Sequence, residues 1–185
     1  MGCKKTIMIF SLCFFSCASG ASVRDNRPFA YLTDSSRFML LPSEDIENSM
    51  DMAQQISAHF AGGDYFLNAY VQADEMGMGI TLLNELGANM GELSYRNGAV
   101  SLTSAVFPKS LRPEYIIADF QLCFYSASRL RSALEDCGLL FEHTETGRRI
   151  LQGETVIIEI EKKPGAVMLT NHLRGYAYTL EGDFE

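Results

Sequence analysis

The sequence predicts an α+β protein dominated by one antiparallel sheet of about ten strands, with an insertion of two helices. Three observations support this fold class. Apolar and polar residues alternate with a period of two in residues 50–104 and again in residues 139–180. Between these blocks the apolar spacing becomes helical, from Pro113 to Cys137. Turn residues such as Asn97-Gly98 separate neighbouring strands, which favours a meander of hairpins.

The N-terminal segment is typical of a secretory signal. Lys4 and Lys5 precede an uncharged, mostly apolar run that ends at Ser16. The run is too short to span a bilayer about 30 Å thick. An alternative is that residues 1–6 are an N-myristoylation motif with a neighbouring palmitoyl cysteine. That alternative would leave the apolar run attached to a cytosolic protein in which it has nothing to cover.

The residues before Cys17 resemble a bacterial lipobox. Ser16 is the small residue that such a motif requires, although Phe14 is bulkier than the usual leucine. We therefore expect residues 1–16 to be a lipoprotein signal peptide and Cys17 to carry the lipid, including an acyl chain such as palmitate. Ordinary signal cleavage at residues 18–20 is the alternative.

Residues 17–36 are expected to form the lipid anchor and a polar tether, and residues 37–185 a single domain. Removing Lys4 and Lys5 from the 15 basic residues leaves 13 against 23 acidic residues, a formal charge of −10. Such a surface repels nucleic acid and anionic headgroups, so nucleic acid is excluded as a partner. Membrane attachment would then depend on the lipid.

The first block predicts five strands. They are expected at residues 50–60, 65–73, 78–83, 90–95 and 100–104. Pro113 suits the first turn of a helix, residues 126–128 mark a break before a second helix, and Gly138 ends that helix. Strands are expected to resume at residues 139–143, 148–151, 155–161, 167–171 and 176–180.

The order of these elements resembles the LolA/LolB-type lipoprotein fold. The segments "FPKSLRPEYIIADFQLCFYSASRLRSAL" (107–134) and "TNHLRGYAYTLE" (170–181) are similar to uncharacterised LolB-like lipoproteins associated with aryl polyene biosynthesis. The resemblance covers roughly residues 40–181. It implies a curved sheet, an incomplete barrel, whose apolar concave face is covered by the helices, and an aryl polyene lipid as the ligand.

A local resemblance concerns the segment "TLLNELGANMGELSY" (81–95), which is similar to a LolB strand-loop-strand with Leu-Gly at its tip. The resemblance implies that Leu86 is a membrane-insertion residue. An alternative is that Leu86 folds back into the core, because single exposed apolar residues are ordinary.

Apolar strand and helix residues are expected to line a hydrophobic ligand cavity on the concave face. A filled core would show the same pattern, and the resemblance favours the cavity. The expected lining residues are Met52, Ile56, Ile80, Leu82, Ile116, Phe120, Phe124, Ile158, Leu169, Tyr176 and Tyr178.

Sequence signatures of catalysis are absent. The chain has no Gly-x-Ser-x-Gly elbow, no phosphate-binding glycine loop and no His-Glu-x-x-His. Its three histidines lack metal-ligand spacing, so we expect no metal and no cofactor. A lipid-modifying enzyme would require a nucleophile near a histidine, for instance Cys123 near His172. Cys123 and Cys137 are either free thiols or a disulfide.

These observations lead us to expect a non-enzymatic lipoprotein on the periplasmic face of the bacterial outer membrane. Ala18 favours this membrane, because it is not the aspartate that favours inner-membrane retention in enteric bacteria. The protein would bind a hydrophobic molecule or the acyl chains of lipoproteins, accept them from a periplasmic carrier protein, and help transfer them to the membrane. The alternative is a structural or interaction subunit of an envelope biosynthesis or transport system.

Overall fold

The computed structural model describes residues 27–104, 107, 109 and 111–184. In chain order, the elements within these residues are β1 (Phe29–Tyr31), β2 (Arg37–Met39), the short 3-10 helix η1 (Ser43–Asp45), β3 (Met50–Phe60), β4 (Gly63–Asp74), β5 (Gly77–Leu83), β6 (Asn89–Arg96), β7 (Ala99–Thr103), α1 (Pro113–Phe124), α2 (Ala127–Asp136), β8 (Leu140–Thr144), β9 (Gly147–Gln152), β10 (Thr155–Lys163), β11 (Ala166–Asn171) and β12 (Tyr176–Glu181).

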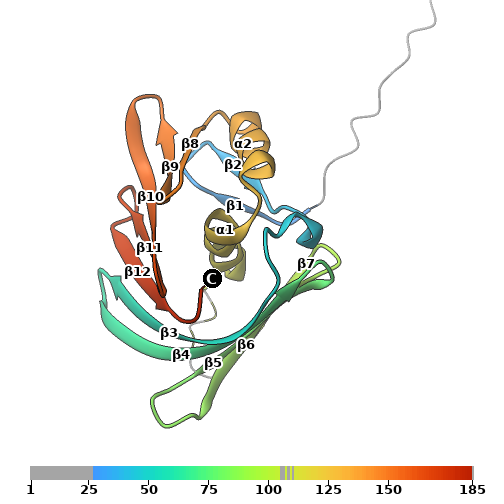
Figure 1. The fold of residues 1–185 in the computed structure, drawn as a ribbon, viewed down its shortest axis with the longest axis vertical. Helices are drawn as coiled ribbons and strands as arrows, with labels where there is room; N and C mark the ends of the chain where they lie inside the picture. The colour runs from blue at the N-terminus through green and yellow to red at the C-terminus, as the bar shows by residue number, and fades with distance from the viewer. Residues whose placement is uncertain (1–26, 105–106, 108, 110, 185) are drawn as a thin grey trace, which may run out of the picture.

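The main sheet has ten strands in the order β7-β6-β5-β4-β3-β12-β11-β10-β9-β8. Every neighbouring pair in it is antiparallel. The sheet curves without closing, so that β7 and β8 remain its two edges (Figure 1). The predicted α+β class, with an incomplete antiparallel barrel and two helices, is confirmed.

Strand positions follow the alternation of apolar residues in the sequence. β3 spans Met50–Phe60 as predicted, and the other predicted strands differ from the structure by only a few residues at their ends. Asn97 and Gly98 both have positive φ angles, of 51° and 72°, in the β6–β7 turn. A tight hairpin turn of this kind requires such angles, and Asn and Gly adopt them most readily.

Helix α1 lies inside the curve of the sheet (Figure 1). It begins at Pro113, and all of its side chains from Ile117 to Phe124 are buried. α2 packs against β8 and β2, and α1 packs against β1 and β7. The two helices, together with the β1–β2 sheet, therefore cover the side of the main sheet that its strands leave open.

The β1–β2 hairpin is a difference from the sequence prediction. Residues 27–36 are predicted to belong to the tether, yet Phe29–Tyr31 pairs with Arg37–Met39, and both Ala30 and Phe38 are fully buried. The folded part of the chain therefore begins before residue 37. Strands of three residues are too short to show a periodic pattern.

The predicted signal peptide, the lipidated Cys17 and the first part of the tether lie outside the described residues. Among the described residues, neither helix has the length and apolar character needed to cross a membrane.

Candidate ligand-binding interior and edge

Ten of the eleven residues predicted to line the concave face lie in or against one hydrophobic core. Ile80, Leu82, Phe120, Phe124, Ile158 and Leu169 are buried in one core. Ile56, Ile116, Tyr176 and Tyr178 are partly buried and pack against that core. Met52 is half-buried and lies opposite Val71 in the β3–β4 pair.

Helix α1 lies within the concave side of the sheet (Figure 1) and is part of the core, instead of only covering that side from outside. The ring centroids of Phe120 and Phe124 are 4.9 Å apart. The ring of Phe124 stacks on that of Phe184, with 5.7 Å between the centroids. Burial on all sides of the last two turns is typical of a helix inside a core. Most of the predicted lining residues therefore belong to a packed core, and their role in ligand binding stays a prediction.

A polar cluster interrupts this apolar interior. The Tyr176 hydroxyl donates a hydrogen bond to Oδ2 of Asp119 at 2.7 Å, and Nδ2 of Asn171 donates to the Tyr176 oxygen at 3.2 Å. Burial raises the pKa of Asp119 to about 7, although the hydrogen bonds from Tyr176 and Tyr178 and the charge of Arg174 act in the opposite direction. Asp119 is therefore a buried acid that titrates near neutral pH.

Sequence reasoning did not identify Asp119. It is the only charged residue in the stretch from Ile116 to Phe124, which is apolar apart from Asp119 and Gln121, and that isolation is the signal that could have found it. Its partner Tyr176 is 57 residues away along the chain. Local sequence patterns do not reveal a contact between residues so far apart along the chain.

The structure does not form the Cys123–His172 pair that a thiol-dependent enzyme would use. The ring of His172 lies near Glu159, with its Nε2 3.7 Å from the carboxylate, and Cys123 is fully buried on α1. Burial raises the pKa of Cys123 to about 12. Cys123 and Cys137 are both free thiols, so the disulfide alternative is not formed.

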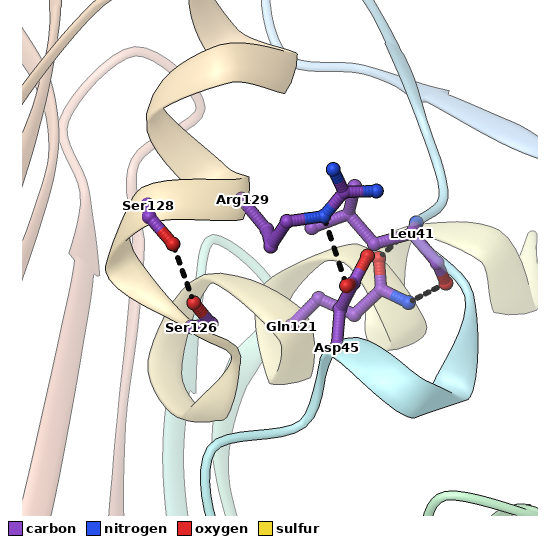
Figure 2. Close-up of polar contacts among 6 residues, drawn as sticks. All are labelled: Leu41, Asp45, Gln121, Ser126, Ser128 and Arg129. Carbon is purple, nitrogen blue, oxygen red and sulfur yellow. Dashed lines mark hydrogen bonds and ion pairs between the residues drawn. The ribbon is translucent and has the colours of Figure 1, made fainter.

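Two side chains join the helices to the segment before β3 (Figure 2). Gln121 donates from Nε2 to the Leu41 carbonyl at 2.8 Å and accepts from the Leu41 N–H at 2.9 Å. Arg129 donates from Nε to Asp45 at 2.9 Å. α1 and α2 are thus fixed to the same short stretch of chain.

Arg148 joins the end of α1 to β9. Its side chain is fully buried and donates to the Leu122 carbonyl and to the Glu47 carboxylate, both at 2.8 Å. The carbonyls of the last turn of a helix lack helical partners. Arg148 satisfies one of them and adds positive charge at the negative end of the helix dipole.

A row of aromatic rings leads from the surface toward Asp119, and we call this row the aromatic edge. It consists of Tyr65, Phe60, Tyr176 and Tyr178. The ring centroids are 5.9 Å apart between Tyr65 and Phe60, 5.6 Å between Phe60 and Tyr176, and 6.4 Å between Tyr176 and Tyr178. Tyr65 is 49% exposed and Phe60 is 41% exposed, whereas Tyr176 and Tyr178 are half-buried. The edge therefore joins the surface to the interior.

Leu86 lies in the β5–β6 turn and is 91% exposed. Oδ1 of Asn84 accepts hydrogen bonds from the N–H groups of Leu86 and Ala88, at 3.0 and 2.8 Å, which fixes the shape of the turn. Leu86 thus points away from the core. β4 runs antiparallel to both β3 and β5, so the β5–β6 turn lies at the same end of the sheet as the aromatic edge.

Metal ligands do not gather in the described part of the chain. There, no group of three His, Cys, Asp or Glu side chains is close enough together to hold a metal ion.

The fold and these features define a class of protein with an open antiparallel barrel wrapped around a buried helix. The chain belongs to the family described as "Protein of unknown function (DUF3261)", whose model matches residues 51–182, from β3 through β12. No curated protein matches the chain.

Proposed function

We propose that this protein is a non-enzymatic outer-membrane lipoprotein that binds a hydrophobic, lipid-like ligand and helps transfer it to the membrane. It is anchored through Cys17 and faces the periplasm. A periplasmic carrier protein delivers the ligand, which is an aryl polyene lipid or the acyl chain of a lipoprotein. This choice of ligand follows from the resemblance to LolB-like lipoproteins, and the curved open sheet is consistent with it.

The observation that carries the proposal is the aromatic edge. Aromatic side chains bury large apolar areas, and a soluble domain that exposes several together commonly uses them for binding. Here the exposed rings of Tyr65 and Phe60 are continuous with half-buried rings that reach the interior. An extended apolar ligand can lie along this row without any charged contact.

Leu86 supplies a second apolar feature at the same end of the sheet. Its turn is fixed by Asn84, so the leucine is presented to its surroundings at low cost in conformational entropy. We propose that Leu86 enters the membrane surface while the ligand leaves the aromatic edge.

Photo-crosslinking in intact cells tests the ligand proposal. Benzoylphenylalanine in place of Phe60 is expected to form adducts with lipid-like molecules, which mass spectrometry of the purified protein detects. The matched control is Tyr70, an aromatic residue of similar exposure, 42%, on the outer face of β4. The proposal fails when no lipid adduct forms at Phe60, or when the yield at Tyr70 is the same.

The second candidate is a structural or interaction subunit. The occupation of the concave face by α1 favours it, because a filled core needs no ligand. In that case, the same crosslinker at Phe60 forms adducts with a protein, visible as a band of higher mass, and with no lipid.

A further inference from the structure

A pocket outside the concave interior lies between β2 and α2. Its volume is about 280 Å³, and we call it the arginine pocket because Arg27, Arg37 and Arg129 line it. Met39, Leu41 and Ala133 form its apolar part, and Ser132 and Asp136 add polar groups. Pockets for drug-sized ligands begin at about 300 Å³, so this one suits a smaller group.

The charge of the arginine pocket is opposite to that of the chain. The protein has a formal net charge of −8. The pocket is lined by three arginines and by one acidic residue, Asp136, and Asp45 is paired with Arg129. Positive charge is therefore concentrated locally on an acidic molecule, and a pocket of this sign attracts anions.

Two of the arginines are held in place by contacts that do not use all of their donors. The Arg37 guanidinium lies 3.8 Å over the Phe29 ring, and stacking through its face leaves the N–H groups directed outward in its plane. Arg129 binds Asp45 through Nε, and its two terminal nitrogens point away from that carboxylate (Figure 2). Both side chains are therefore ordered before any ligand arrives.

We propose that the arginine pocket binds a phosphate group, either free or in the headgroup of an anionic lipid. Planar guanidinium groups match the geometry of phosphate oxygens and form paired, charge-assisted hydrogen bonds with them. The Ser132 hydroxyl can donate a further bond, and the apolar part of the pocket accommodates the carbon atoms of a small headgroup. This site is separate from the aromatic edge and does not depend on a ligand there.

The proposed anchor gives the pocket access to lipid headgroups. Arg27 follows Cys17 by ten residues, which span at most about 35 Å when extended. A lipid on Cys17 therefore keeps the pocket near the membrane surface. This step alone rests on the proposed anchoring, whereas binding of free phosphate does not.

Calorimetric titration of the full chain in neutral detergent tests the proposal. The probes are inorganic phosphate and two short-chain lipids, dihexanoyl phosphatidylglycerol and dihexanoyl phosphatidylcholine. We expect the anionic lipid to bind more tightly than the zwitterionic one. Binding of the anionic lipid alone identifies a headgroup site, and binding of inorganic phosphate as well identifies a general phosphate site.

Two variants locate the binding. Arg37→Gln removes one guanidinium and is expected to weaken binding about tenfold or more, the effect of losing a charge-assisted hydrogen bond. Ser132→Glu introduces a carboxylate at an exposed position of α2 and is expected to abolish binding without disturbing the fold. Ser132→Gln, of similar size but uncharged, is the matched control for the second variant.

A charge-matched control is Arg149→Gln, because Arg149 is an exposed arginine that pairs with Glu159 on another part of the molecule. The Arg149→Gln variant is expected to bind the phosphate and lipid probes as tightly as the unmodified protein does. The proposal is overturned when neither inorganic phosphate nor the anionic lipid binds. It is also overturned when Arg37→Gln and Ser132→Glu bind as tightly as Arg149→Gln does.

Discussion

Asp119 illustrates how one polar residue can influence an apolar interior. A buried carboxyl group is costly in its charged form, and a hydrogen bond from Tyr176 offsets only part of that cost. The pKa near 7 means that the folded protein keeps the proton of Asp119 over a range in which the unfolded chain releases it. The stability of the fold is therefore linked to pH through this residue.

The variant Asp119→Asn is expected to remove this link. The pKa of Asp119 is 3.8 in the unfolded chain and about 7 in the folded protein, so its contribution to stability is fully present below pH 4 and is lost as the pH rises through 7. The difference between these two pKa values corresponds to a change on the order of 4 kcal/mol in the free energy of unfolding. The asparagine keeps an acceptor for Tyr176 and stays neutral, so Asp119→Asn should be more stable than the unmodified protein at pH 8.

Urea unfolding of both proteins between pH 4 and 8 measures this difference. His143 contributes to the pH dependence with the opposite sign, because burial, followed by the charges of Arg148 and Lys162, lowers its pKa. Its contribution is common to both proteins and cancels in the comparison. Equal pH dependence of the two unfolding free energies would show that Asp119 is ionised in the fold at neutral pH.

The two cysteines of the folded domain should differ in reactivity. The thiolate is the reactive form of cysteine, and burial raises the pKa of Cys123 to about 12. Burial also raises the pKa of Cys137, but this residue is half-buried at the end of α2. Iodoacetamide at pH 8, followed by peptide mass spectrometry, should label Cys137 first and Cys123 only after denaturation. Equal labelling of both in the folded protein would contradict the burial of α1.

At the scale of elements, most strands of the main sheet were predictable from alternating apolar and polar residues and from the turn residues between them. β3 is the clearest case, with Met50, Met52 and Ile56 on the concave side. The helix break near Ser126 was predictable from its capping residues. β1 and β2 were not, because three residues cannot display a period, and Ala30 is buried by contacts with distant segments.

Gln121 fixes α1 to the chain segment before β3, and its replacement should measure that attachment. Gln121→Ala removes two hydrogen bonds and leaves the buried N–H and carbonyl of Leu41 without their partners. Each unsatisfied group costs about 1–3 kcal/mol, so for two groups we expect a loss of roughly 2–6 kcal/mol in the free energy of unfolding. Urea denaturation measures it, with the exposed Gln72→Ala on β4 as the control. A loss no larger than that of the control would mean that the attachment contributes little.

At the scale of the whole molecule, the curved open sheet was predictable, whereas the content of its concave side was not. Ile80, Phe120 and Leu169 are apolar whether they line a cavity or pack in a core, so composition cannot distinguish the two. The placement of α1 distinguishes a filled core from a cavity, because its residues from Ile117 to Phe124 are buried on every side. A ligand of the interior would have to displace contacts of this helix, which is why the proposed binding begins at the exposed rings of Phe60 and Tyr65.

The acidic character of the whole molecule leads to a last prediction, about attachment to the membrane. Without residues 1–16, the proposed signal peptide, the chain carries 13 basic and 23 acidic residues, which disfavours electrostatic adhesion to anionic lipids. The arginine pocket offers a single local contact, and one phosphate contact cannot retain a protein that the rest of the surface repels. The several acyl chains of the proposed lipoprotein anchor, by contrast, would hold it firmly, since each buried CH₂ contributes about 0.8 kcal/mol.

Cys17→Ser should therefore move the folded protein from the membrane fraction to the soluble periplasmic fraction after processing. Cell fractionation and immunoblotting measure the distribution, and a lipoprotein with its own unmodified lipobox, probed in the same cells, is the control for the fractionation. Release should be as complete at low ionic strength as at high, because charge attraction is not the source of attachment. A processed Cys17→Ser protein that stays with the membrane at both ionic strengths would show that Cys17 is not the anchor.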